Sequence, residues 1–262
     1  MNYPHRPAAA PSATALAALR PWTVTPGGSP ARAMPLTRRY EILWLDSDGR
    51  VQEMTRVAPA MPAFEAPFSA LARGTLVEAP GGPVAIEDLL PGTLISTPAG
   101  PRPVRWIGRI TLPPANLRQD EGPDIFRLTT DAFGHGRPAP DLVLCSGARL
   151  VRRVARLAGP GRSPEVLVPV AEFADGIHVT LISPVSPVSA FHLALDEHAA
   201  ITVNGLAVES FHPGKDLHAI LPGEFLRLWL SMFPYLRALS DFGPLALPRL
   251  SLVEIEALAM RA

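Results

Sequence analysis

Two histidines and a carboxylate at even spacing are the clearest candidates for chemistry in this chain. His192, Asp196 and His198 occur in one apolar segment, 191–198. Because alternate side chains of a β-strand point to the same side, a continuous strand would place all three on one face. They could then bind zinc, or Asp196 could orient a histidine for proton transfer. We favour an idle remnant of a site, because this set without fixed geometry is a weak metal signal. We expect no metal and no cofactor.

Two other side chains could act as nucleophiles. The Ser69 hydroxyl attacks poorly at neutral pH without a positioned base, and only His192 or His198, brought close by the fold, could supply one. Cys145 is the only cysteine, and Arg149, four residues later, could favour its thiolate. An isolated cysteine is more often a small buried hydrophobe. We therefore expect an ordinary loop serine and a packed cysteine.

Charge and cysteine content narrow the class of protein. Lys plus Arg and Asp plus Glu each number 24 in 262 residues, a formal net charge of +0. No nucleic acid is expected as a partner, because phosphate binding needs a basic surface. One cysteine excludes an internal disulfide framework. Residues 1–19 make a poor secretory signal, and no apolar run reaches the roughly 18 residues of a membrane span. We expect a soluble cytoplasmic protein with an unknown protein partner, and secretion without a signal peptide stays open.

The pattern of short apolar runs predicts a mainly β fold. The 31 prolines and many short β-branched runs favour strands and turns over helices. Strands are expected at 75–78, 93–97, 104–110, 125–129, 142–144, 166–168, 178–182 and 191–195. Regular short strands separated by turn residues are typical of a sandwich or barrel-like fold.

Four parts are expected along the chain. Residues 1–37, rich in Ala, Pro, Gly and Ser, predict a flexible tail. Residues 38–67 predict a hairpin, with Tyr40, Ile42 and Trp44 on one face, and then a linker at 57–67 that its prolines hold extended. The β domain follows at 68–215. Helical spacing at 223–238 and 248–261 then predicts a helical cap over 216–262 that covers one side of the β core.

Three motifs resemble the Hint (Hedgehog/intein) self-processing domain in its bacterial form. The first runs from Gly74-Thr75 through the turn at 80–83 and Pro91-Gly92 to the segment 104–108. The second, 141–150, looks like the strand that leads into a Ser-Pro-x-His-Arg turn of that family. The third, and most specific, comprises 191–198, Asn204-Gly205 and the sequence Glu-Ser-Phe-His-Pro-Gly at 209–214. The resemblance covers about 65–215 and implies a Hint-like β fold with an N-terminal hairpin and C-terminal helices.

The resemblance also implies self-cleavage, but two parts of that chemistry are missing. In the family, a cysteine four residues before the Gly-Thr pair attacks the peptide bond ahead of itself, and a histidine of the second motif protonates the leaving nitrogen. Those positions are Ala70 and Ala148 here. We therefore expect a degenerate site to which no catalytic residue is assigned, and a binding or scaffold role without enzyme activity.

Two enzyme hypotheses remain as alternatives. The first is self-cleavage near 68–70 by Ser69, with His192 or His198 as the base. The second and weaker one is a metal-dependent hydrolase at the same two histidines.

Overall fold

The computed structural model describes residues 36–117, 122–159 and 163–260, all within the compact unit Pro35–Ala262. The predicted flexible tail at 1–37 lies outside the described residues except for its last two positions. The predicted end of the second cap helix, at 261, also lies outside them.

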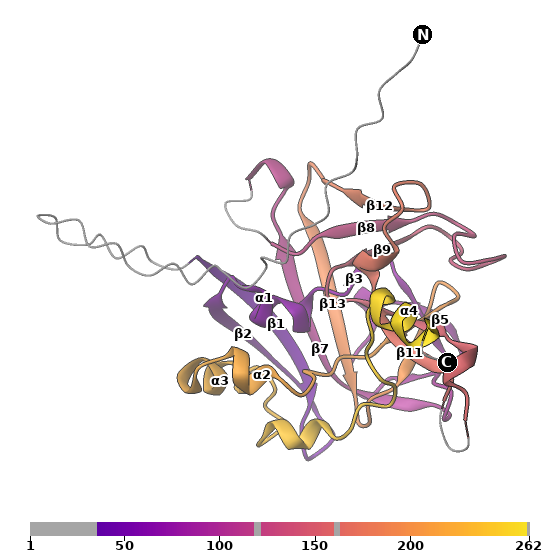
Figure 1. Cartoon of the computed structure of the whole chain (residues 1–262). Helices are drawn as coiled ribbons and strands as arrows, with labels where there is room; N and C mark the ends of the chain where they lie inside the picture. Colours follow the sequence, from indigo (N-terminus) through magenta and orange to yellow (C-terminus); the bar gives the residue numbers. More distant parts are fainter. Residues whose placement is uncertain (1–35, 118–121, 160–162, 261–262) are drawn as a thin grey trace, which may run out of the picture. The chain divides into compact units, whose positions relative to one another are not determined.

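Two antiparallel sheets form the framework (Figure 1). The larger sheet has the order β12-β8-β9-β3-β13-β7-β1-β2, with β6 paired to one end of β7. The smaller has the order β11-β10-β15-β14-β4-β5. The strands of the larger sheet are β1 Thr37–Leu45, β2 Val51–Pro59, β3 Leu71–Ala72, β6 Leu94–Ile95, β7 Arg102–Leu112, β8 Ile125–Leu128, β9 Leu142–Cys145, β12 Val179–Ile182 and β13 Val188–Leu195. Those of the smaller sheet are β4 Leu76–Ala79, β5 Gly82–Ala85, β10 Arg149–Arg153, β11 Glu165–Pro169, β14 Ala200–Val203 and β15 Leu206–Glu209.

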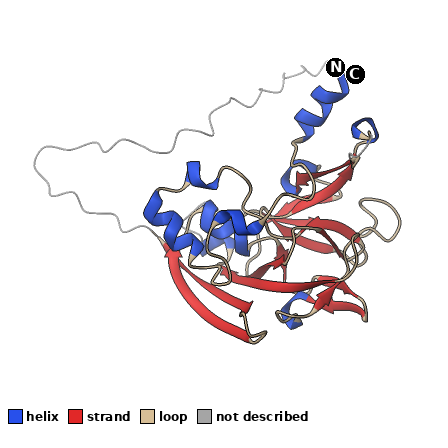
Figure 2. Cartoon of the chain, turned by 90° about the horizontal axis from the view of Figure 1, so that it is seen from below, coloured by secondary structure: helices blue, strands red, loops and turns tan. Residues whose placement is uncertain are grey.

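The predicted mainly β fold is confirmed, and each predicted strand segment overlaps a strand of the structure. The principal hydrophobic core draws buried side chains from both sheets, such as Val77 and Val203 from the smaller and Leu144 and Leu193 from the larger. The helices are short and lie around the strands (Figure 2). They are α1 Pro62–Glu65, η1 Ala66–Phe68, η2 Ile86–Asp88, η3 Ala115–Leu117, η4 Ala155–Leu157, η5 Val170–Phe173, α2 Leu217–Ile220, α3 Gly223–Leu230, η6 Leu239–Phe242 and α4 Leu252–Met260. None of the described helices is long and apolar enough to cross a membrane.

The N-terminal hairpin is part of the larger sheet. β1 pairs with β2 along its whole length and also with β7 from Tyr40 to Trp44. The extended linker predicted at 57–67 is wrong, because β2 continues to Pro59 and the chain is helical from Pro62 to Phe68. A proline fixes φ near −65°, which suits the first turn of a helix as well as an extended chain. Proline content alone therefore could not decide between the two.

The C-terminal cap shares a second, aromatic core with the N-terminal hairpin. The Trp106 ring of β7 stacks on Phe233 at a centroid distance of 4.6 Å and meets Phe68 edge-on at 5.2 Å. The Trp106 Nε1–H donates to the Met232 carbonyl over 2.8 Å. The Trp229 Nε1–H donates to the carbonyl of Ala63 in α1, over 2.9 Å. Segments at opposite ends of the described chain thus complete one core.

The cap differs from its prediction in two places. The helix predicted at 223–238 ends at Leu230. The helix predicted from 248 begins at Leu252, because residues 248–250 run beside β11. There the Leu167 N–H donates to the Pro248 carbonyl over 2.8 Å, and the Leu250 N–H donates to the Leu167 carbonyl over 3.0 Å. Backbone pairing with a distant strand overrides the local helical pattern.

We expect Phe233→Ala to lower the free energy of unfolding by about 3–5 kcal/mol, because it empties a fully buried ring site. Phe233 is 0% exposed. Phe225→Ala, in the same cap but 39% exposed, is the matched control, and we expect it to cost less than about 1 kcal/mol. Urea unfolding of both variants measures this. Equal losses would show that the cap is not part of the aromatic core.

Candidate functional site

The peptide bond between Ser69 and Ala70 lies at the place where the sequence motifs put the cleavage point. The Ser69 carbonyl accepts the Gly147 N–H over 2.9 Å. The Ala70 N–H donates to the Phe191 carbonyl over 3.0 Å, and the Ala70 carbonyl accepts the Cys145 N–H over 2.8 Å. The bond is therefore held from both sides, by β13 and by the end of β9 with the turn after it.

Gly147 allows this close approach. A Cβ atom at that position would lie 2.5 Å from the Ser69 carbonyl oxygen and 2.9 Å from that of Ala66. Real Cβ atoms do not come so close to backbone oxygen, so any larger residue would push the turn away. The glycine thus keeps its own N–H on the Ser69 carbonyl.

The two alanines at the expected catalytic positions are core residues. Ala70 is 1% exposed and Ala148 is 2% exposed, and both belong to the principal hydrophobic core. A methyl group can neither attack a carbonyl nor transfer a proton. The side chains at both positions are therefore chemically inert.

Ser69 is buried, and its hydroxyl is already used. The side chain is 1% exposed, and its Oγ–H donates to the Glu65 carbonyl over 2.8 Å. Glu65 is itself paired with Arg38. Among the described residues, Ser69 makes no hydrogen bond to His192 or His198, whose own partners include Ala66 and Glu209. The bond that this hydroxyl donates within the described part of the chain thus goes to a backbone carbonyl and not to a basic side chain.

His192 lies on β13 close to the same segment. It is 3% exposed, and its Nδ1 lies 3.3 Å from the Ala66 carbonyl. Because a carbonyl can only accept, Nδ1 carries the hydrogen and Nε2 has the lone pair. Nε2 is buried and has no hydrogen-bond partner among the described residues. The ring meets Phe211 edge-on at 5.2 Å. Burial lowers the pKa of His192 to about 4, so the ring is neutral at pH 7.

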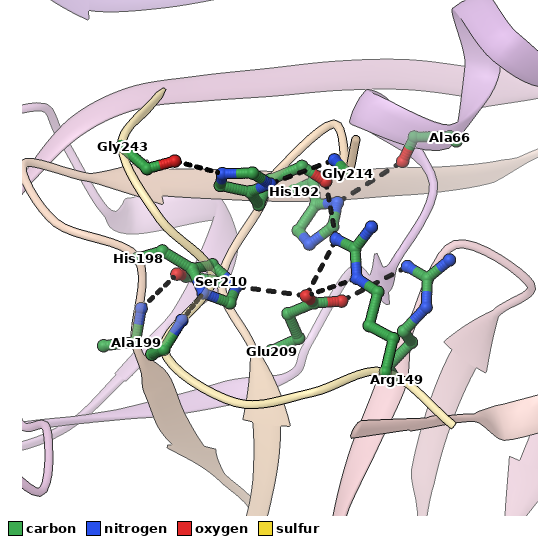
Figure 3. A network of polar contacts seen from close by, with 12 residues as sticks. Ala66, Arg149, His192, His198, Ala199, Glu209, Ser210, Gly214 and Gly243 are labelled. Carbon is green, nitrogen blue, oxygen red and sulfur yellow. Dashed lines mark hydrogen bonds and ion pairs between the residues drawn. The ribbon is translucent and has the colours of Figure 1, made fainter. Parts of the chain in front are cut away.

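Glu209 at the end of β15 is the centre of a buried polar network (Figure 3). Its side chain is 1% exposed. One carboxylate oxygen accepts from His198 Nε2 over 3.0 Å and from Arg249 Nε over 2.8 Å. The other lies 3.2 Å from Arg149 Nη1. Burial alone would raise the pKa of Glu209, but the His198 hydrogen bond and the two arginine charges outweigh it and lower the pKa to about 2.

The Glu209 network links residues 243–249 of the C-terminal segment to the β domain through hydrogen bonds. His198 Nδ1 accepts the Ala246 N–H over 2.9 Å, while the Arg249 guanidinium also donates to the His212 carbonyl over 2.6 Å. His212 Nε2 donates to the Gly243 carbonyl over 3.0 Å. In each imidazole one nitrogen donates and the other accepts, so both rings act as structural links; the acceptor of His212 is Nδ1, which takes the Gly214 N–H over 3.0 Å.

The structure does not bring the predicted set of His192, Asp196 and His198 onto one face. β13 ends at Leu195, with a register shift just before it, so the condition of a continuous strand fails. Asp196 is exposed and lies 3.8 Å from Arg102. Across residues 36–117, 122–159 and 163–260, no group of three or more metal-binding side chains gathers.

Cys145 takes the buried position expected for an isolated cysteine. It is 0% exposed at the end of β9 and belongs to the aromatic core. The guanidinium of Arg149, which could have favoured a thiolate, pairs with Glu209 instead.

Three residues of the site were missed from the sequence. Glu209 lies within the third motif, and a carboxylate in an apolar strand segment was the available signal. Gly147 lies within the second motif, where a glycine before a strand also fits an ordinary turn. Arg249 has no local signal, because its partner lies 40 residues earlier.

A cavity of about 750 Å³ opens beside Ser69. Its walls come from α1 and η1, from residues 122–124, and from the turn between β9 and β10. Asp124 and Ser146 are exposed on it, and Arg149 contributes to its wall. The cavity therefore combines both signs of charge with hydroxyl groups next to the Ser69–Ala70 bond.

One comparison with known proteins identifies the family of this chain. The model of a protein family described as "Hint domain" matches residues 69–215, more than half of the chain. The chain belongs to the Hint-domain family. A solution structure of a bacterial intein-like domain from Clostridium thermocellum is also similar, at 14% identity and a TM-score of 0.36, covering 55% of this chain and 99% of that chain. The comparison with curated proteins gave no match. The family match begins at Ser69, one residue before the position at which the resemblance implies the nucleophile.

We expect the buried His192 of this Hint domain to make the free energy of unfolding fall in mild acid. Its folded pKa of about 4 lies below the value of 6.5 for an exposed histidine. As pH falls, the unfolded chain therefore binds a proton at this histidine before the folded chain does. The contribution of neutral His192 to the free energy of unfolding is fully present above about pH 6.5 and is lost towards pH 4. Between pH 7 and pH 5 we expect a loss of about 2 kcal/mol in the free energy of unfolding.

Urea unfolding at pH 7 and pH 5 measures the loss in free energy of unfolding in the native chain and in His192→Gln. The variant should lack the part of the loss that His192 causes. His135→Gln is the control, since His135 is fully exposed and should leave the loss unchanged. Burial also lowers the pKa of His212, so a smaller dependence should remain in His192→Gln. An unchanged dependence in His192→Gln would contradict the assignment.

Proposed function

We propose that this Hint domain no longer processes itself and acts as a binding or scaffold module. The observation that carries the proposal is the burial of the Ser69–Ala70 bond in the core, with Ala70 and Ala148 at the positions of the nucleophile and the proton donor. Neither side chain can take part in acyl transfer.

The hydrogen bonds around that bond support the proposal. Cleavage requires the nitrogen of Ala70 to leave as an amine, which needs a proton donor aimed at it. In the structure that nitrogen instead donates its own hydrogen to the Phe191 carbonyl. The neighbouring hydroxyl, on Ser69, donates to Glu65, and its use as a nucleophile would first require that bond to break.

The packing of the chain before Ser69 also supports the loss of self-processing. Tyr40, Phe64 and Phe68 are 0% exposed and share the aromatic core with Trp106 of the Hint domain. β1 is paired with β7. A cut after Ser69 would therefore leave two pieces held in one sheet and one core, so it would release nothing.

The cavity beside Ser69 is the place where we propose that a ligand or partner segment binds. Its volume of about 750 Å³ lies within the range of about 300–1,000 Å³ usual for ligand sites. Asp124 and Ser146 would offer an acceptor and a hydroxyl, and Arg149 a positive charge.

The intact mass of the full-length chain tests the loss of processing. After incubation at neutral pH with and without dithiothreitol, we expect one species of 28.0 kDa under both conditions. A thiol cleaves a thioester or ester intermediate, so it would reveal a site that is only blocked in its second step.

Ser69→Ala and His198→Ala separate the alternatives. Two fragments that meet near 68–70, absent in Ser69→Ala, would establish self-cleavage by Ser69 and overturn the proposal. Metal that copurifies with the native chain and is lost in His198→Ala would support the hydrolase alternative instead.

A further inference from the structure

The outer edge of β2 is left unpaired in the described structure. β2 is the last strand of the larger sheet and pairs with β1 along nine residues, from Val51 with Leu45 to Pro59 with Thr37. No strand within the described residues pairs with its other side, and Figure 1 shows β2 at the margin of the sheet. The N–H and C=O groups of such an edge can pair with another strand.

The hairpin register shows which backbone groups face outward. The Asp46 N–H donates to the Arg50 carbonyl, and the Ala60 N–H donates to the Leu36 carbonyl. Hydrogen-bonded pairs recur at every second position of an antiparallel ladder, so the even-numbered residues of β2 bond to β1. Residues 51, 53, 55 and 57 therefore direct their N–H and C=O groups outward. Pro59 has no N–H to offer.

We propose that a second copy of this chain pairs with this edge, with β2 antiparallel to β2 about a two-fold axis at Met54. In that register Val51 lies opposite Val57 of the second copy, and Glu53 lies opposite Thr55. All four outward N–H groups of each strand then find a carbonyl on the other strand. The two larger sheets become one continuous sheet.

The side chains favour this register over its neighbours. It brings together two exposed apolar residues, Val51 and Val57, which are 45% and 65% exposed in the single chain. A two-fold axis at Glu53 would place two carboxylates opposite each other, and an axis at Arg56 would place two guanidinium groups opposite each other, which is destabilising. An axis at Thr55 would set Val51 against Pro59, which has no N–H to donate, and would leave Val51 and Val57 without each other as partners.

The edge is therefore complementary to itself, which argues for a second copy rather than an unrelated strand. A contact limited to one pair of strands is smaller than the roughly 1,200 Å² of a standard stable interface. We accordingly expect a weak dimer whose population rises with protein concentration.

Disulfide trapping in the full-length chain tests the register. Residues at a non-hydrogen-bonded antiparallel position have Cα atoms about 4.5 Å apart, a separation that a disulfide can span. Met54→Cys should therefore give a covalent dimer under mild oxidation, while Thr55→Cys should stay monomeric. The native Cys145 is 0% exposed and should not interfere. Trapping in Thr55→Cys alone, or in neither variant, would overturn the proposal.

Paired charge variants test the association without a crosslink. In sedimentation equilibrium, Val51→Lys with Val57→Lys places lysine opposite lysine and should weaken dimerisation about tenfold. Val51→Glu with Val57→Lys adds the same number of charges but places Glu opposite Lys, and should keep the dimer. A native chain that stays monomeric at the highest concentration reached, or two variants that behave alike, would contradict the proposed pairing.

Discussion

A buried peptide bond must have both its polar groups paired, and this constraint on Ser69–Ala70 shapes the centre of the molecule. The carbonyl is satisfied by Gly147 and the N–H by Phe191. These partners belong to different elements, the turn after β9 and the strand β13. The bond lies directly before β3, which pairs with both β13 and β9 in the larger sheet.

Glu209 is a buried charge, and it must be paired just as the buried peptide bond must. A buried carboxylate is costly unless cations and donors surround it, and here Arg149, Arg249 and His198 do so. Because Arg249 comes from the C-terminal segment, satisfying this charge also fixes the cap to the β domain. The aromatic core around Trp106 fixes the cap and the N-terminal hairpin from the other side. Removing one partner of Glu209 would leave a buried charge with too few donors.

The sequence predicted the strands and the Hint family because both depend on local patterns of apolar, Gly and Pro residues. It could not predict that Pro62 begins a helix, since one φ angle serves both helix and extended chain. A shared face for Asp196 and His192 depended on a strand that continues past Leu195, but β13 ends there, just after a shift in its register with β7. The pairing of Glu209 with Arg249 joins residues 40 apart and leaves no local signal.

The central claim is that the Ser69–Ala70 bond is a structural part of the core rather than a strained junction ready for cleavage. Native-state hydrogen exchange at the Ala70 and Gly147 amides tests this most directly, because those two N–H groups hold the bond. Both should exchange only through global unfolding, with the free energy that denaturant unfolding gives. Exchange through a local opening, at a free energy several kcal/mol lower, would contradict the account.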